Sequence, residues 1–301
     1  MKKILLVAMA ATMFAACTQN EELEIAGSNK EMKFNTAVMS TTRATATTNG
    51  TFKEFKLYAY FGEKNANAII NGKVFTKDTE SSKWACGAEV FYWPGAENVS
   101  FYGYSPSTLT CTGAETPTLA YTVDADASKQ VDLLVTSPKS QNSEGGAVAL
   151  SFSHALTKMA FQVSGTNSDV TYKITSITIN AKSAGNYTFG TGWDAGTTPI
   201  DYSVATNVTD IIGDAAATTV GETLMMLPQQ GAKITVAYTY STTGTGEITA
   251  TPKSFTIDWE AGKNLLYTIA LDGPSVMDIT GEVIDGDWAN TPDSGTLTPA
   301  K

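Results

Sequence analysis

Hydrophobic and polar positions alternate along most of this chain in short runs, and this alternation is the main guide to its fold. Residues 55–61 and 148–152 carry an apolar side chain at every second position, and residues 255–259 and 265–271 repeat the pattern. A period of two places successive side chains on opposite faces of a half-buried β-strand. No long segment has apolar residues at the 3.6-residue spacing of a helix. The pattern therefore predicts an all-β protein with few, short helices.

Local signals between the runs predict how the strands connect. Within residues 68–75, Asn71 and Gly72 predict a tight hairpin turn between two apolar arms, because both residues accept positive φ angles. Between residues 172 and 179 the alternation changes phase, which predicts a bulge or bend. Residues 139–146 are polar and glycine-rich, which is typical of a linker. Repeated short strands on both sides of this linker predict two antiparallel β-sandwiches.

The first residues have the features of a secretory signal. A basic start at residues 1–3 precedes an apolar run, residues 4–13, that is too short to span a bilayer. Small residues then stand directly before Cys17. This is the pattern of a bacterial lipoprotein signal, in which Cys17 is lipidated and becomes the new N-terminus; an ordinary cleaved signal is the alternative. Acyl chains on Cys17 would anchor the protein to a membrane without a transmembrane helix.

A single arginine follows a segment that resembles a β-strand. Arg43 is the single arginine of the chain and lies among small polar residues, while the preceding residues 32–39 read as a strand. An arginine-specific protease would therefore have one site, the bond between Arg43 and Ala44, and its action would remove that strand. We expect Met32, Phe34 and Val38 to fill a groove of the first sandwich until the cut is made.

These signals divide the chain into four parts. Residues 1–17 form the signal with its lipidated cysteine, and residues 18–43 form a removable tether and strand. Residues 44–145 form the first β-sandwich, and residues 146–301 form the second, with a terminal strand.

Charge and cysteine content narrow the possible partners. The formal net charge is −10 and the isoelectric point is about 4.6, which disfavours binding to nucleic acid or to an anionic membrane surface. Cys86 and Cys111 remain after lipidation of Cys17. An oxidising compartment permits a disulfide between these two cysteines but does not require one.

The chain offers little catalytic chemistry. His154 is its single histidine and has apolar neighbours, which favours a structural role over a general base. The acidic segments 124–128 and 285–287 could hold calcium, but they read better as solvated turns. No phosphate loop or nucleophile motif is present, and nothing predicts a cofactor, a metal or an enzyme. Four aromatic residues could stack on sugars, although such residues more often pack in cores: Trp93, Tyr102, Tyr104 and Trp193.

Several segments, in order, resemble the fimbrillin-like proteins of Bacteroides and its relatives. Besides the signal and the strand before Arg43, they are residues 89–94, 99–106, 132–135, 150–159 and 259–269. The resemblance implies two transthyretin-like sandwiches, an outer-membrane lipoprotein precursor, and cleavage at Arg43 by an arginine-specific protease. It also implies assembly with other subunits into a cell-surface type V pilus, with a host or bacterial surface ligand as a further partner.

Three functional hypotheses follow. The first is a pilus subunit that polymerises by strand donation, with residues 276–284 as a plausible donor strand broken by Gly281. The second is a surface lipoprotein that binds glycans and does not polymerise. The third is a secreted hydrolase, for which no carboxylate pair stands out. The arginine behind a strand favours the first hypothesis.

Overall fold

The computed structural model describes residues 30–38, 50–79, 81–212 and 216–284 of the 301-residue chain. Short strands account for most of these residues, and the only helices among them are three single 3-10 turns: η1 (Glu63–Asn65), η2 (Ala127–Lys129) and η3 (Ser143–Gly145). The predicted all-β fold with few, short helices is therefore confirmed. Within this part of the chain, no helix is long and apolar enough to cross a membrane.

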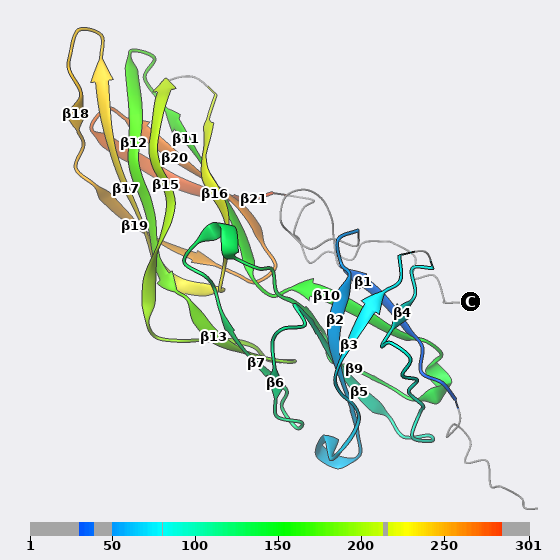
Figure 1. Ribbon diagram of the computed structural model, residues 1–301. Helices are drawn as coiled ribbons and strands as arrows, with labels where there is room; N and C mark the ends of the chain where they lie inside the picture. Colours follow the sequence, from blue (N-terminus) through cyan, green and yellow to red (C-terminus); the bar gives the residue numbers. More distant parts are fainter. Residues whose placement is uncertain (1–29, 39–49, 80, 213–215, 285–301) are drawn as a thin grey trace, which may run out of the picture.

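The N-terminal part is built on one eight-stranded sheet (Figure 1). Its order is β1-β10-β8-β5-β2-β3-β4, with β9 also paired to β5. The strands are β1 (Phe34–Val38), β2 (Glu54–Phe61), β3 (Asn67–Lys77), β4 (Trp84–Ala85), β5 (Val99–Ser105), β8 (Leu134–Thr136), β9 (Lys139–Gln141) and β10 (Val148–His154).

The C-terminal part consists of two sheets that pack face to face. One has the order β16-β11-β20-β21, and the other has the order β15-β12-β17-β18 with β19 also paired to β17. The strands are β11 (Thr157–Gly165), β12 (Val170–Lys182), β15 (Pro199–Ile212), β16 (Thr218–Met226), β17 (Gln229–Thr242), β18 (Ile248–Thr249), β19 (Lys253–Trp259), β20 (Asn264–Asp272) and β21 (Ser275–Val283). The register of β12 against both neighbours shifts near Ile174, which confirms the predicted bulge.

A small fourth sheet joins the two parts. Its order is β14-β13-β7-β6, with strands β6 (Cys111–Thr112), β7 (Thr118–Thr122), β13 (Ala184–Thr188) and β14 (Gly192–Ala195). Strands β6 and β7 belong to the N-terminal half of the chain, whereas β13 and β14 follow β12 of the C-terminal part. Backbone pairing between β7 and β13 therefore links the halves directly.

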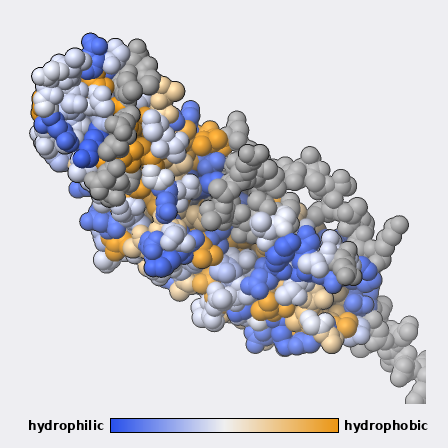
Figure 2. Space-filling view, turned by 45° about the horizontal axis from the view of Figure 1, so that its top comes forward, coloured by the Kyte–Doolittle hydropathy of each residue, from blue (hydrophilic) through white to orange (hydrophobic). Residues whose placement is uncertain are grey.

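The two faces of the eight-stranded sheet enter different cores. One face is rich in phenylalanine and forms a core with Trp93 and the strand β1. The other face is rich in tyrosine, and its side chains belong to the same apolar cluster as the core of the C-terminal part. On the face shown in Figure 2, hydrophobic residues lie in several separate groups along the elongated molecule.

Two local predictions differ from the structure. Residues 68–75 form no hairpin, because β3 runs through them as one strand and Gly72, at φ +63°, lies in a bulge opposite Tyr58. A Cβ atom at Gly72 would lie 2.7 Å from the Tyr58 hydroxyl oxygen, so this position requires glycine for both backbone and space. The predicted linker 139–146 contains β9 and η3, and β10 after it still belongs to the N-terminal sheet. The strands therefore change from one part to the other after His154, not at residue 145.

Candidate functional site

The strand β1 lies at an edge of the N-terminal sheet and pairs with β10 in parallel (Figure 1). The register runs from Phe34 opposite Val148 to Val38 opposite Phe152, and Val148 N–H donates to the Lys33 carbonyl at 2.7 Å. Every other strand pair in this sheet is antiparallel. A parallel neighbour cannot be joined by a tight hairpin, and β1 indeed pairs with a strand more than a hundred residues further along the chain.

A second backbone segment holds the start of this strand from the other side. Met32 N–H donates to the Phe91 carbonyl at 2.8 Å, and Trp93 N–H donates to the Lys30 carbonyl at 3.0 Å. The Lys30 ammonium also donates to the Ser143 carbonyl. Residues 30–38 thus lie in a groove between β10 and residues 91–93. The sequence pattern predicted residues 148–152 as a strand, whereas residues 91–93 form no strand and contribute only the isolated bridge between Tyr92 and Glu31. The positions of both walls on either side of β1 required the tertiary structure.

The three predicted groove-filling side chains point into the phenylalanine-rich core. Met32 is 4% exposed, Phe34 is 8% exposed and Val38 is fully buried. Phe34 packs edge-on against Phe75, at 5.1 Å between ring centroids, and against Phe101, at 6.0 Å. The strand β1 therefore contributes three buried side chains to the phenylalanine-rich core.

Other predicted site residues lie outside the part of the chain that the structure describes. These are Cys17, Arg43 and Ala44, together with the acidic segment 285–287. Residues 39–49, which contain the predicted cleavage site, lie in the sequence between β1 and β2. The structure thus places the groove-filling strand directly before the predicted cleavage segment.

The predicted donor strand is paired within the chain. Residues 275–283 form β21, an edge strand antiparallel to β20, with Val283 opposite Leu265. Gly281, which breaks the alternation, lies under the ring of Tyr267, and a Cβ atom there would come within 2.7 Å of the ring. Val283 is exposed. One side of β21 is thus free of any strand within the described part of its sheet.

Most of the candidate chemical residues are buried and make contacts within the chain. The Nδ1 atom of His154 lies 3.0 Å from a carboxylate oxygen of Asp132, and both side chains are buried. Trp93, Tyr102 and Tyr104 are also buried, which leaves Trp193 as the partly exposed member of the four aromatic candidates.

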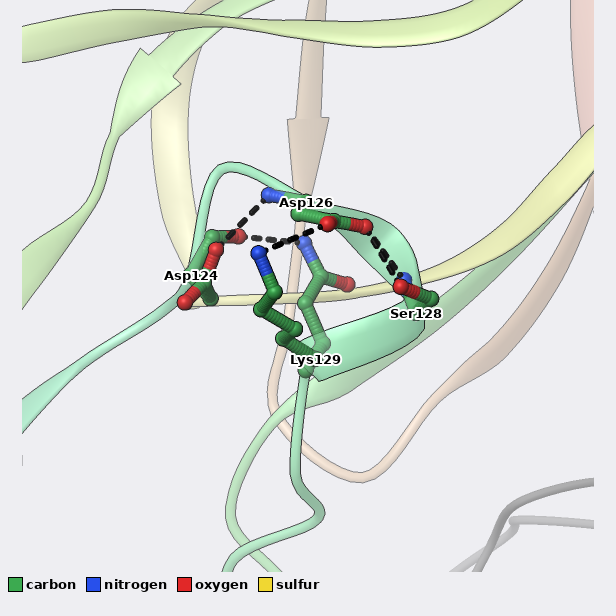
Figure 3. A network of polar contacts seen from close by, with 5 residues as sticks. Asp124, Asp126, Ser128 and Lys129 are labelled. Carbon is green, nitrogen blue, oxygen red and sulfur yellow. Dashed lines mark hydrogen bonds and ion pairs between the residues drawn. The ribbon is translucent and has the colours of Figure 1, made fainter.

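The acidic segment 124–128 forms a turn whose polar groups satisfy one another (Figure 3). Asp126 accepts from the Ser128 backbone and hydroxyl and pairs with Lys129 at 3.0 Å, and these contacts lower the pKa of Asp126 to about 2. In the described residues no group of three or more metal-ligating side chains occurs. The turn reading of residues 124–128 fits this geometry better than a calcium loop.

The two cysteines face different cores. Cys111 is buried in the tyrosine-side cluster, whereas Cys86 packs against the phenylalanine-side cluster, and both thiols are free. These two clusters lie on opposite faces of the eight-stranded sheet, and this separation disfavours a disulfide between Cys86 and Cys111.

Comparison with known proteins agrees with this architecture. The fimbrillin-like family profile matches residues 42–288. A candidate cell adhesion protein from Bacteroides uniformis has 19% identity and a TM-score of 0.52, over 86% of this chain and 99% of that one. A second from Bacteroides ovatus has 18% identity and a TM-score of 0.56, over 86% and 98% of the two chains.

A third candidate cell adhesion protein, from Parabacteroides distasonis, has a TM-score of 0.60 at 11% identity, over 88% of this chain and 98% of that one. At these identities the likeness shows the fold. No curated protein matches.

Sheet topology and the buried edge strand define an all-β protein assembled from packed sheets. The profile match over most of the chain makes the identification more specific: the chain belongs to the fimbrillin-like family. Membership of this family indicates a structural protein of the cell surface, associated with fimbriae and adhesion.

Proposed function

We propose that this chain is a structural or adhesive subunit of a type V pilus, polymerised by strand donation after cleavage between Arg43 and Ala44. One observation carries the proposal. The strand β1 fills the core of the N-terminal sheet at its edge, and its covalent link to β2 runs through the segment that contains the single arginine of the chain. The fimbrillin-like family profile supports the same assignment.

The energetics favour exchange of the strand once the link is cut. Burying Met32, Phe34 and Val38 contributes roughly 1.5–3 kcal/mol each, or about 5–9 kcal/mol together. While the chain is intact, β1 binds as part of the same molecule and has a high effective concentration. After cleavage its binding becomes bimolecular and must offset about 4 kcal/mol or more of lost translational and rotational freedom. A cut strand is therefore held weakly, although an uncut strand is held firmly.

A vacated groove would be a strong acceptor for another strand. It would expose the apolar floor around Phe75 and Phe101 together with the unpaired backbone edge of β10. A strand from a second subunit can bury that floor and pair with the edge. The edge strand β21 is the donor that we propose, because it lies at the outside of its sheet near the C-terminal end of the described chain. Polymerisation would thus be withheld until a protease acts.

Export as a lipoprotein completes the proposal. Acyl chains on Cys17 would hold the precursor in the outer membrane until cleavage at Arg43 separates the lipid from the rest of the subunit. Cys17→Ala should leave an unprocessed or mislocalised precursor. Normal outer-membrane localisation of that variant would contradict the lipoprotein step.

The decisive test replaces the arginine. Arg43→Ala should give a folded monomer that does not enter pili, and Arg43→Lys should behave in the same way towards an arginine-specific protease while remaining cleavable by trypsin. Thr42→Ala keeps the arginine in the same polar segment and serves as the matched control, which should polymerise normally. If Arg43→Ala forms pili at the cell surface, strand removal by cleavage at Arg43 is not the trigger of assembly. If the cleaved wild-type protein forms no pili either, a non-polymerising lipoprotein that binds glycans becomes the better account.

A peptide experiment tests the groove itself. A synthetic peptide of residues 32–40 should inhibit oligomerisation of the cleaved protein, because it can fill the vacated groove. The same peptide with alanine at Phe34 should inhibit much less, since it lacks the side chain that packs against Phe75 and Phe101. Equal inhibition by both peptides would show that the groove is not the assembly site.

A further inference from the structure

A cleft of about 450 Å³ opens where the N-terminal and C-terminal parts meet. Its walls come from the end of β10, the β13–β14 hairpin, the start of β17 and the end of β19. This volume falls within the range of pockets that hold small ligands, roughly 300–1,000 Å³. The cleft is separate from the groove of β1, because none of the residues 30–38 or 91–93 lines it.

Three aromatic side chains shape the cleft. The Trp193 indole N–H donates to the Ala155 carbonyl at 2.6 Å, and the Trp259 indole N–H donates to the Leu227 carbonyl at 2.6 Å. Tyr187 stands edge-on to Trp193, with 5.4 Å between ring centroids and 72° between planes. Trp259 is nearly buried and forms part of the floor, whereas Tyr187 and Trp193 are partly exposed. Because the indole N–H groups are bound to the backbone, the rings are held in fixed orientations.

The polar groups of the cleft select the charge of a ligand. Among the described residues that line it there is no lysine or arginine, and Glu260 is an exposed carboxylate at its rim. Gln230 is also exposed there and offers both an amide donor and an acceptor. Burial raises the pKa of Tyr187, so its hydroxyl stays protonated at neutral pH. A phosphate, sulfate or carboxylate ligand would meet no lysine or arginine among these residues and would face the Glu260 carboxylate, whereas Gln230 and Glu260 can bond the hydroxyls of a neutral ligand.

We propose that this cleft binds a neutral pyranose saccharide, with the apolar face of the sugar ring against Trp193 and its hydroxyls bonded to Gln230 and Glu260. The fixed aromatic ring supplies apolar contact area at little cost in conformational entropy, and the amide and carboxylate at the rim match the donors and acceptors of sugar hydroxyls. The inference does not depend on polymerisation, because the cleft is complete within one chain.

The test uses the full-length chain and a panel of neutral sugars. The panel consists of the methyl glycosides of glucose, galactose, mannose and N-acetylglucosamine, with cellobiose, maltose and N-acetyllactosamine. Saturation-transfer NMR and calorimetry should detect binding of at least one member below 10 mM. Trp193→Ala should weaken that binding by at least tenfold, whereas Trp193→Phe should keep most of it.

Exposed rim variants separate recognition from folding. Gln230→Ala and Glu260→Gln should each weaken binding by about two- to tenfold, the range expected for one hydrogen bond. Two matched controls should leave it unchanged: Asn186→Ala, next to Tyr187 but on the opposite face of β13, and Glu222→Gln, an exposed glutamate on β16. The proposal is overturned if no sugar in the panel binds or if the rim variants bind like their controls.

Discussion

Replacing Phe34 by alanine tests how firmly β1 is held. The Phe34 ring is buried between Phe75 and Phe101, and the truncation leaves a cavity at that point. Phenylalanine-to-alanine changes in cores cost about 3–5 kcal/mol. We expect the lower end of this range, about 3 kcal/mol, because Phe34 belongs to an edge strand. At about 1.4 kcal/mol for each factor of ten, the affinity of the cut strand should fall roughly 100-fold.

The assay follows the strand after cleavage at Arg43. An arginine-specific protease cuts the soluble precursor, and native mass spectrometry measures the fraction of N-terminal peptide that remains bound over a dilution series. Asn35→Ala is the matched control, because Asn35 is adjacent to Phe34 but points to the other face of β1 and is partly exposed. We expect this control to change the affinity less than about threefold, as for an ordinary surface substitution.

The expected effect on assembly has the opposite sign to the effect on stability. Phe34→Ala should lower the thermal stability of the uncut precursor, yet the cut protein should oligomerise faster because the groove is vacated sooner. The extent of oligomerisation at equilibrium should not fall, since the donor strand comes from another subunit with its own side chains and competes with a weaker β1. The reasoning fails if Phe34→Ala and Asn35→Ala release the peptide equally, or if Phe34→Ala assembles more slowly than the wild type.

Three further predictions concern the described core. Gly221→Ala should cost at least about 2 kcal/mol of unfolding free energy, because φ is +70° and the new Cβ would lie 1.9 Å from a backbone carbonyl oxygen. Gly244→Ala, with φ +85° and open space, should cost about 1 kcal/mol. Equal denaturation midpoints of the two variants would contradict the steric reasoning. Asp132→Ala should cost about 1–3 kcal/mol, because the buried histidine loses an acceptor; an unchanged denaturation curve would refute this. Iodoacetamide at pH 8 should label Cys86 well before Cys111, since Cys86 is partly exposed whereas Cys111 is buried. Burial raises the pKa of both thiols, that of Cys111 to about 11. Equal rates in peptide mapping would contradict the burial of Cys111.

The alternation of residues identified most strands because it depends only on nearest neighbours. A strand with one buried face must carry an apolar side chain at every second position. The strands β2, β10, β19 and β20 could therefore be recognised from the sequence alone. The phase slip in β12 had the same local origin. The apolar set Met32, Phe34 and Val38 also followed from this rule, and all three side chains are buried.

The sequence did not determine which strands lie side by side. Parallel pairing of β1 with β10 joins residues more than a hundred positions apart, and its choice depends on the complementarity of two assembled surfaces. The same limit applies to the boundary between the N-terminal and C-terminal parts. The strand β10 follows a linker-like segment but hydrogen-bonds to β8 of the N-terminal sheet. Local composition cannot reveal a partner that is distant in the chain.

Asn71 and Gly72 show the difference most clearly. By itself the pair favours a hairpin turn, since both residues accept positive φ. In the folded protein β2 pairs along both sides of the pair, and the glycine instead makes room for the Tyr58 hydroxyl in a bulge. The sequence by itself showed a residue that accepts a positive φ angle at position 72, between two apolar strand-forming runs. Only the tertiary structure decided between turn and bulge, because that choice depends on whether a neighbouring strand continues past the glycine.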